Sequence, residues 1–133
     1  INIGELKMTI KRPRRDLQIY RGDTPTFGFQ LMDVNESTGT KTPIDLSSGF
    51  ILKGQVRYSP ENTDVLYELP IKVLDAKNGL CQIRIPKTAS ETLLPPGSSL
   101  SDTATYDIQV SYGENVLTIL TGGFSIIRDV TRG

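Results

Sequence analysis

Apolar side chains recur at every second position in several short stretches of this chain. A two-residue period places one side chain in a core and the next in solvent, which is the pattern of a half-buried strand. The clearest stripe is Tyr106, Ile108, Val110 and Tyr112. Similar stretches lie at residues 6–10, 26–31, 50–58, 65–74, 81–85, 116–121 and 124–126. The pattern predicts an all-β fold and favours a two-sheet sandwich over a small barrel.

Glycine and proline separate these stretches. Asn78-Gly79 is a strong hairpin signal, and Pro70 is expected to break or bend the strand that contains it. Gly113-Glu114-Asn115 predicts a turn, and Gly122-Gly123 is expected to separate the last two strands. Gly54 interrupts the inward positions of its strand, as glycine does at a bulge or a close backbone approach.

Two kinds of segment depart from the strand pattern. Residues 87–94 lie between Pro86 and Pro95-Pro96 and contain helix formers, so we expect a helical connection of at most two turns between the sheets. Residues 34–43 and 95–105 are rich in Ser, Thr, Asn, Gly and Pro and are predicted to be loops.

The composition argues against an enzyme. A chain of 133 residues is the size of one domain. It has no His, which excludes Ser-His and Cys-His catalysis and His-ligated metals. A single Cys excludes an internal disulfide or a zinc cluster. The carboxylates Glu68, Asp75 and Asp107 lie on different predicted strands, and nothing in the sequence brings them together. We therefore expect no catalytic, cofactor-binding or metal-binding residues and no cofactor.

Basic residues gather near the start of the sequence. Five of the 15 Lys and Arg residues lie within the first 15 positions, and Lys11, Arg12, Arg14 and Arg15 form the densest group. We interpret residues 1–16 as a basic arm and residues 17–133 as the β-sandwich domain. The chain as a whole has no net charge, and its aromatic residues fall at inward positions, so we expect a protein partner for the arm and no nucleic acid. No apolar stretch is long enough to span a membrane, and no membrane partner is expected.

Three other signals have simple structural interpretations. Arg21-Gly22-Asp23 matches an integrin-recognition tripeptide but lies between two apolar runs, so we interpret it as a tight turn. The stretch 33–39 has some features of a calcium loop but lacks the bidentate Glu, which favours a polar hairpin loop. Cys81 is in phase with the apolar residues of its strand, and we expect a buried structural thiol.

Several short motifs follow one another in a distinctive order. They are Tyr20-Arg21-Gly22-Asp23-Thr24, Phe27 and Phe29, Pro43-Ile44-Asp45-Leu46-Ser47, Val56-Arg57-Tyr58, Ile83-Arg84-Ile85-Pro86, Thr105-Tyr106-Asp107-Ile108-Gln109-Val110, Gly123-Phe124-Ser125-Ile126 and Asp129-Val130-Thr131-Arg132. This order resembles the small immunoglobulin-like proteins encoded among tailed-phage structural genes. It is similar in particular to the N-terminal domain of the baseplate upper protein that carries receptor-binding proteins. The basic arm is an addition to the usual pattern.

The resemblance implies an immunoglobulin-like antiparallel β-sandwich of about seven to nine strands, with the helical connection near residues 87–94. It implies a non-enzymatic structural protein of the phage virion: an adaptor of the tail or baseplate that docks fibres, spikes or neighbouring subunits. We expect other virion proteins as partners and several copies, as a homo-oligomer or within a symmetric assembly. The candidate partner-binding residues are Lys11, Arg12, Arg14, Arg15, Asn35, Thr40, Ser98 and Asp102.

Three alternatives remain open at this point. A sandwich of the same class could bind a carbohydrate or the host surface, which would need exposed aromatic platforms. A capsid decoration protein would use the same kind of surface on the phage head. Nucleic-acid packaging through the basic arm would require binding that weakens steeply with salt.

Overall fold

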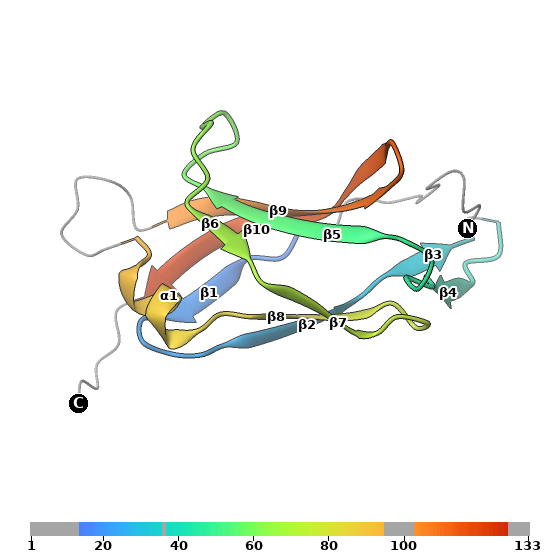
Figure 1. Cartoon of the computed structure of the whole chain (residues 1–133), viewed down its shortest axis with the longest axis horizontal. Helices are drawn as coiled ribbons and strands as arrows, with labels where there is room; N and C mark the ends of the chain where they lie inside the picture. The colour runs from blue at the N-terminus through green and yellow to red at the C-terminus, as the bar shows by residue number, and fades with distance from the viewer. Residues whose placement is uncertain (1–13, 36, 95–102, 128–133) are drawn as a thin grey trace.

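A computed structural model describes residues 14–35, 37–94 and 103–127. The described residues are mostly strand and contain one short helix (Figure 1). The elements are β1 (Leu17–Tyr20), β2 (Thr26–Gln30), β3 (Met32–Val34), β4 (Lys41–Pro43), β5 (Ile51–Arg57), β6 (Tyr67–Leu69), β7 (Ile71–Asp75), β8 (Leu80–Arg84), α1 (Lys87–Thr92), β9 (Thr103–Tyr112) and β10 (Asn115–Ile127). The predicted all-β class is confirmed, and so is the short helix.

Two larger sheets and one small hairpin organise these strands. The five-stranded sheet has the order β1-β10-β9-β5-β6, and the three-stranded sheet has the order β2-β8-β7. The strands β3 and β4 pair only with each other. Within the five-stranded sheet, β1 runs parallel to β10, whereas the other neighbouring strands are antiparallel. The prediction of a purely antiparallel fold is therefore wrong at this pair.

The described residues form ten strands, more than the seven to nine predicted. Pro70 divides one predicted strand into β6 and β7, because proline cannot donate a ladder hydrogen bond. The strands β3 and β4 have only three residues each, too few to show a clear alternation, and β4 lies inside the predicted 34–43 loop. The predicted strand at residues 6–10 lies outside the described residues.

The core lies between the two larger sheets, which face each other in Figure 1. Alternate residues of β9 point into it, and Tyr106, Ile108 and Val110 are all buried, as the sequence predicts. From the opposite sheet β8 contributes Cys81 and Ile83. Phe27 and Phe29 also face inward but are only half-buried, because β2 is an edge strand.

The local turn signals have mixed outcomes. Asn78-Gly79 does close the β7–β8 hairpin, with Gly79 at φ +65°. Pro70 marks the point where the chain crosses from the five-stranded sheet to the three-stranded one. Gly122 and Gly123, in contrast, do not separate two strands, because both lie within the continuous β10.

The reason for glycine at position 122 is a close approach between two backbones. A Cβ atom there would lie 2.1 Å from the carbonyl oxygen of Arg15, on the chain that enters β1. Any side chain would therefore collide with that backbone. Gly54 has a related role in the neighbouring part of the sheet, where a Cβ would lie 3.0 Å from Leu69 Cδ1.

No helix within residues 14–35, 37–94 and 103–127 has the length and apolar character to cross a membrane.

Candidate functional site

The outer face of the five-stranded sheet, turned away from the core, carries a row of polar side chains in register. Arg14 bridges to Thr121 on β10, and Thr121 pairs with Asp107 on β9. Asp107 pairs with Gln55 on β5, which pairs in turn with Glu68 on β6. Five segments thus contribute one line of polar groups across the sheet.

A depression of about 440 Å³ lies on this row. Its floor comes from residues of β5, β9 and β10, most of them outward-facing, and Pro60 in the β5–β6 loop also lines it. Figure 1 shows this loop and the β9–β10 hairpin rising on the side away from the three-stranded sheet. The lining residues are Arg14, Lys53, Gln55, Arg57, Pro60, Thr105, Tyr106, Asp107, Gln109, Thr121 and Gly122.

Cations outnumber carboxylates in this lining. Arg14, Lys53 and Arg57 each carry a positive charge, whereas Asp107 is the one acidic residue. Burial raises the pKa of Asp107, and the positive charge of Arg57 opposes that rise. Lys53 is exposed, and no hydrogen bond or ion pair joins it to the other described residues. The depression is therefore polar, and with Arg14 ion-paired to Asp16 its lining carries one more cation than carboxylate.

Arg57 is held by two fixed contacts. Its guanidinium donates to the carbonyl oxygen of Asn62 at 2.7 Å and to Gln55 Oε1 at 3.0 Å. Gln55 Nε2 donates in turn to Glu68 Oε1 at 2.9 Å. This chain of hydrogen bonds ties the β5–β6 loop to the sheet and fixes the position of the Arg57 charge.

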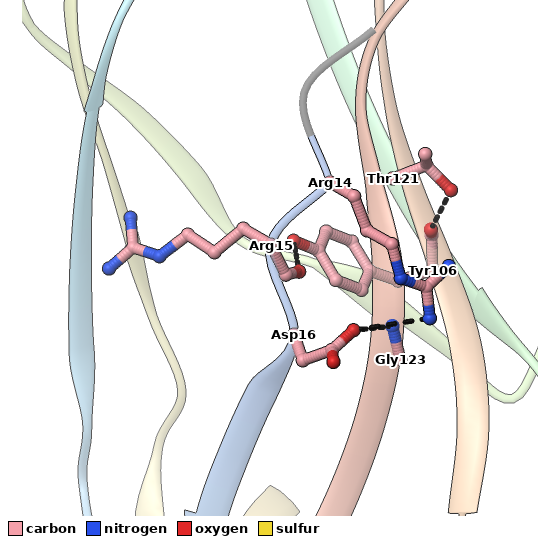
Figure 2. Close-up of polar contacts among 6 residues, drawn as sticks. All are labelled: Arg14, Arg15, Asp16, Tyr106, Thr121 and Gly123. Carbon is pink, nitrogen blue, oxygen red and sulfur yellow. Dashed lines mark hydrogen bonds and ion pairs between the residues drawn. The ribbon is translucent and has the colours of Figure 1, made fainter.

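Arg14 lies at the opposite side of the depression, where the chain enters β1 (Figure 2). Its guanidinium contacts Asp16 Oδ1 at 3.2 Å, and the same oxygen accepts a hydrogen bond from the backbone N–H of Gly123 at 2.8 Å. The backbone N–H of Arg15 donates to the carbonyl oxygen of Thr121 at 2.9 Å. These contacts fasten residues 14–16 to β10, so the last three residues of the predicted basic arm already pair with the sheet.

Tyr106 connects this corner to the core. Its hydroxyl donates a hydrogen bond to the carbonyl oxygen of Arg15, and its own carbonyl oxygen accepts one from Thr121 Oγ1 (Figure 2). Burial raises the pKa of Tyr106 to about 12. The phenol therefore stays protonated at neutral pH and acts as a structural donor.

Arg15 points away from the depression and toward the other sheet. Its guanidinium donates to the carbonyl oxygen of Gly28 on β2 at 2.9 Å and lies over the ring of Phe27, 5.6 Å from the ring centre. The side chain spans the gap between β1 and β2 by a hydrogen bond and a cation–π contact. Arg14 and Arg15, although adjacent, serve different sides of the molecule.

The remaining predicted partner-binding residues lie elsewhere. Asn35 and Thr40 close the β3–β4 hairpin, where the backbone N–H of Asn35 donates to the carbonyl oxygen of Thr40 at 2.9 Å. This confirms the prediction of a polar hairpin loop. Neither residue lines the depression. The predicted residues outside the described part of the chain are Lys11, Arg12, Ser98 and Asp102.

The Arg21-Gly22-Asp23 motif is a tight turn, as predicted. Gly22 has φ +88°, and the backbone N–H of Asp23 donates to the carbonyl oxygen of Tyr20 at 3.1 Å. The Arg21 guanidinium donates to the carbonyl oxygens of Glu91, Leu93 and Leu94 at the end of α1. This arginine satisfies groups that the end of a helix leaves without partners.

Glu68 and Asp107 do not meet, because Gln55 lies between them in the polar row, and Asp75 lies on β7 of the other sheet. The outward positions of Lys53, Gln55 and Arg57 are visible in the alternation, but their meeting with Asp107 depends on strand pairing. Cys81 is buried as predicted, and burial raises the pKa of its thiol.

Neither a protein-family model nor a curated protein matches this sequence. Within the described part of the chain, no three His, Cys, Asp or Glu side chains are grouped so that they could hold a metal ion.

Proposed function

We propose that this chain is an immunoglobulin-like structural module of a tailed-phage virion, which docks neighbouring subunits, fibres or spikes and has no enzymatic role. The strand order supports the immunoglobulin-like part of the proposal. The three-strand sets β10-β9-β5 and β2-β8-β7 have the order expected for the two sheets of such a sandwich, and β6 lies where the variable type would extend the first sheet.

The docking part of the proposal is supported by β2, which is an edge strand of the three-stranded sheet. The carbonyl oxygen of Pro25 accepts a hydrogen bond from the N–H of Ile85, and the N–H of Leu31 donates one to the carbonyl oxygen of Gly79. Both bonds point toward β8. In an antiparallel ladder, the backbone groups of alternate residues point to the same side. Because Pro25 and Leu31 bond toward β8, the backbone groups of the residues at even positions (Thr26, Gly28 and Gln30) point away from β8. The carbonyl oxygen of Gly28 is bonded by Arg15; its N–H has no partner among the described residues. Apart from the carbonyl oxygen that Arg15 occupies, this outward row of backbone groups is a template for an added strand.

Within the described part of the chain, the opposite edge of the same sheet is also unpaired. The strand β7 pairs only with β8, and its Val73 and Leu74 side chains are 41% and 54% exposed. Two open edges on one sheet permit each copy to contact two neighbours, which suits a protein present in several copies.

Gly28 offers a direct test of docking through β2. Proline at this position removes an N–H that faces away from β8 and leaves the β2–β8 ladder intact. Alanine is the matched control, since its Cβ would meet no atom closer than the Cys81 carbonyl oxygen at 3.9 Å. Each variant is supplied to a phage that lacks this gene, and its copies per purified particle are counted by quantitative mass spectrometry.

We expect Gly28→Ala to enter particles at wild-type numbers and folded Gly28→Pro to be reduced at least fivefold. Circular dichroism and thermal melting of both purified variants establish that they are folded. Equal incorporation of the two folded variants would contradict docking through β2, and absence of the wild-type chain from particles would contradict the virion proposal itself.

A further inference from the structure

The depression on the outer face of the five-stranded sheet combines fixed positive charge with a nearby apolar strip. Arg57 is positioned by its bonds to Asn62 and Gln55, and Arg14 by its contact with Asp16. Lys53 has no partner among the described residues and is free to bind a ligand. Arg14 is ion-paired with Asp16, so the lining sets the charges of Lys53 and Arg57 against the carboxylate of Asp107. The excess charge selects a ligand with negative groups.

The apolar strip lies two residues further along β5. Ile51 and Val116 both pair with Ser111, so they flank it in one row on the same outer face. Their side chains are 66% and 60% exposed, which is high for large apolar residues. A free phosphate or other small anion would use the cations and leave this strip in water. A protein segment would cover both.

The spacing of these groups fits an extended strand-like segment. Ile51, Lys53, Gln55 and Arg57 alternate along one face of β5, which covers about 20 Å at 3.3 Å per residue. An extended ligand lying along β5 has the same two-residue period. It would place an apolar side chain at Ile51 and carboxylates opposite Lys53 and Arg57.

We propose that this depression is the docking site for an acidic, extended segment of a partner protein, with an apolar residue at one end and carboxylates at alternate positions after it. The inference rests on the proposed function, because it names the kind of partner that a docking module would take. The surface is separate from the open edge of β2, so the two can be tested apart.

Asp107 makes the proposal specific. It lies in the centre of the polar row, between Thr121 and Gln55, and its negative charge opposes an acidic ligand. Removing that charge should strengthen binding, whereas removing the charge of Lys53 should weaken it. The two variants therefore have opposite expected effects at the same site.

The test is an NMR titration of the ¹⁵N-labelled full chain. The probe is a capped heptapeptide with leucine first, glutamate at the third, fifth and seventh positions and serine between them. The control peptide has glutamine in place of glutamate, and inorganic phosphate is titrated separately. Chemical-shift changes give the location and the Kd. The protein variants are Lys53→Gln, Asp107→Asn and the matched control Lys72→Gln, which removes an exposed lysine from the other sheet.

We expect the glutamate peptide to shift amides of β5, β9 and the start of β1, with a Kd at least five times lower than that of the glutamine peptide. Lys53→Gln should raise the Kd at least threefold, Asp107→Asn should lower it at least twofold, and Lys72→Gln should leave it unchanged. Added salt should weaken binding, since the pairs are partly exposed.

Three results would overturn the inference: equal binding of the two peptides, an unchanged or higher Kd for Asp107→Asn, or phosphate shifting the same amides as strongly as the glutamate peptide. The last result would assign the depression to a small anion. None of them would affect incorporation of the chain into particles through β2, so failure here is distinguishable from failure of the proposed function.

Discussion

Substitution of Gly122 by alanine should be one of the most destabilising small changes in this chain. The new Cβ would lie 2.1 Å from the carbonyl oxygen and 2.7 Å from the carbonyl carbon of Arg15. Both are backbone atoms, so no side-chain rotation relieves the overlap. The segment that enters β1 must move away from β10.

The expected size of the effect follows from what that movement breaks. Forcing an extra methyl group into a packed site costs about 1–3 kcal/mol. The movement also separates Arg15 from the two groups that bond its backbone, the carbonyl of Thr121 and the hydroxyl of Tyr106, at about 1 kcal/mol each. Alanine also lowers the conformational entropy of the unfolded chain relative to glycine, which offsets roughly 0.4–1 kcal/mol of this loss. The net loss in free energy of unfolding should be about 2–4 kcal/mol.

Urea denaturation followed by circular dichroism measures this loss. Gly28→Ala is the control, because its Cβ has room, and its free energy of unfolding should stay within about 0.5 kcal/mol of the wild type. A loss below about 1 kcal/mol for Gly122→Ala, at an unchanged dependence on urea, would refute the close packing of the β1 segment against β10.

Two further outcomes are expected from contacts around the same fold. Burial raises the pKa of Tyr106 to about 12, so the unfolded chain releases the phenol proton at a lower pH than the folded chain does. The contribution of Tyr106 to stability is complete below about pH 10 and declines as pH rises toward 12, by about 3 kcal/mol in total. Urea titrations at a series of alkaline pH values should show this decline in the wild type and lack it in Tyr106→Phe. An equal fall of the free energy of unfolding with pH in the two proteins would contradict it. Arg21→Met should lower the free energy of unfolding by about 2–3 kcal/mol, since three carbonyl oxygens at the end of α1 lose their donor. Amide hydrogen exchange in α1 should also become faster. Unchanged exchange in this helix would contradict the capping role of Arg21.

The parts of the fold that the sequence predicts are those set by local chemistry. The β9 stripe of Tyr106, Ile108 and Val110 is buried because a two-residue period can serve only one face of a sheet. Asn78-Gly79 and Pro70 act through their own backbone restrictions, so their effects are visible without the partner strands. The short helix after Pro86 is predictable for the same reason.

What the sequence does not predict depends on pairing between distant segments. Gly122-Gly123 matches a turn signal, but β10 continues through it, and the glycine at 122 is explained by the close approach of the Arg15 backbone. The polar row needs the register of β5 against both β6 and β9 before Gln55 can lie between Glu68 and Asp107. The candidate site is therefore a product of register, which single-strand patterns do not encode.

Cross-linking mass spectrometry on intact, purified phage particles tests the central claim most directly. We expect the chain to be present in several copies per particle, with cross-links from exposed lysines such as Lys53 and Lys72 to other tail or baseplate proteins. Particles that contain the wild-type phage's full set of structural proteins but lack this chain would contradict it.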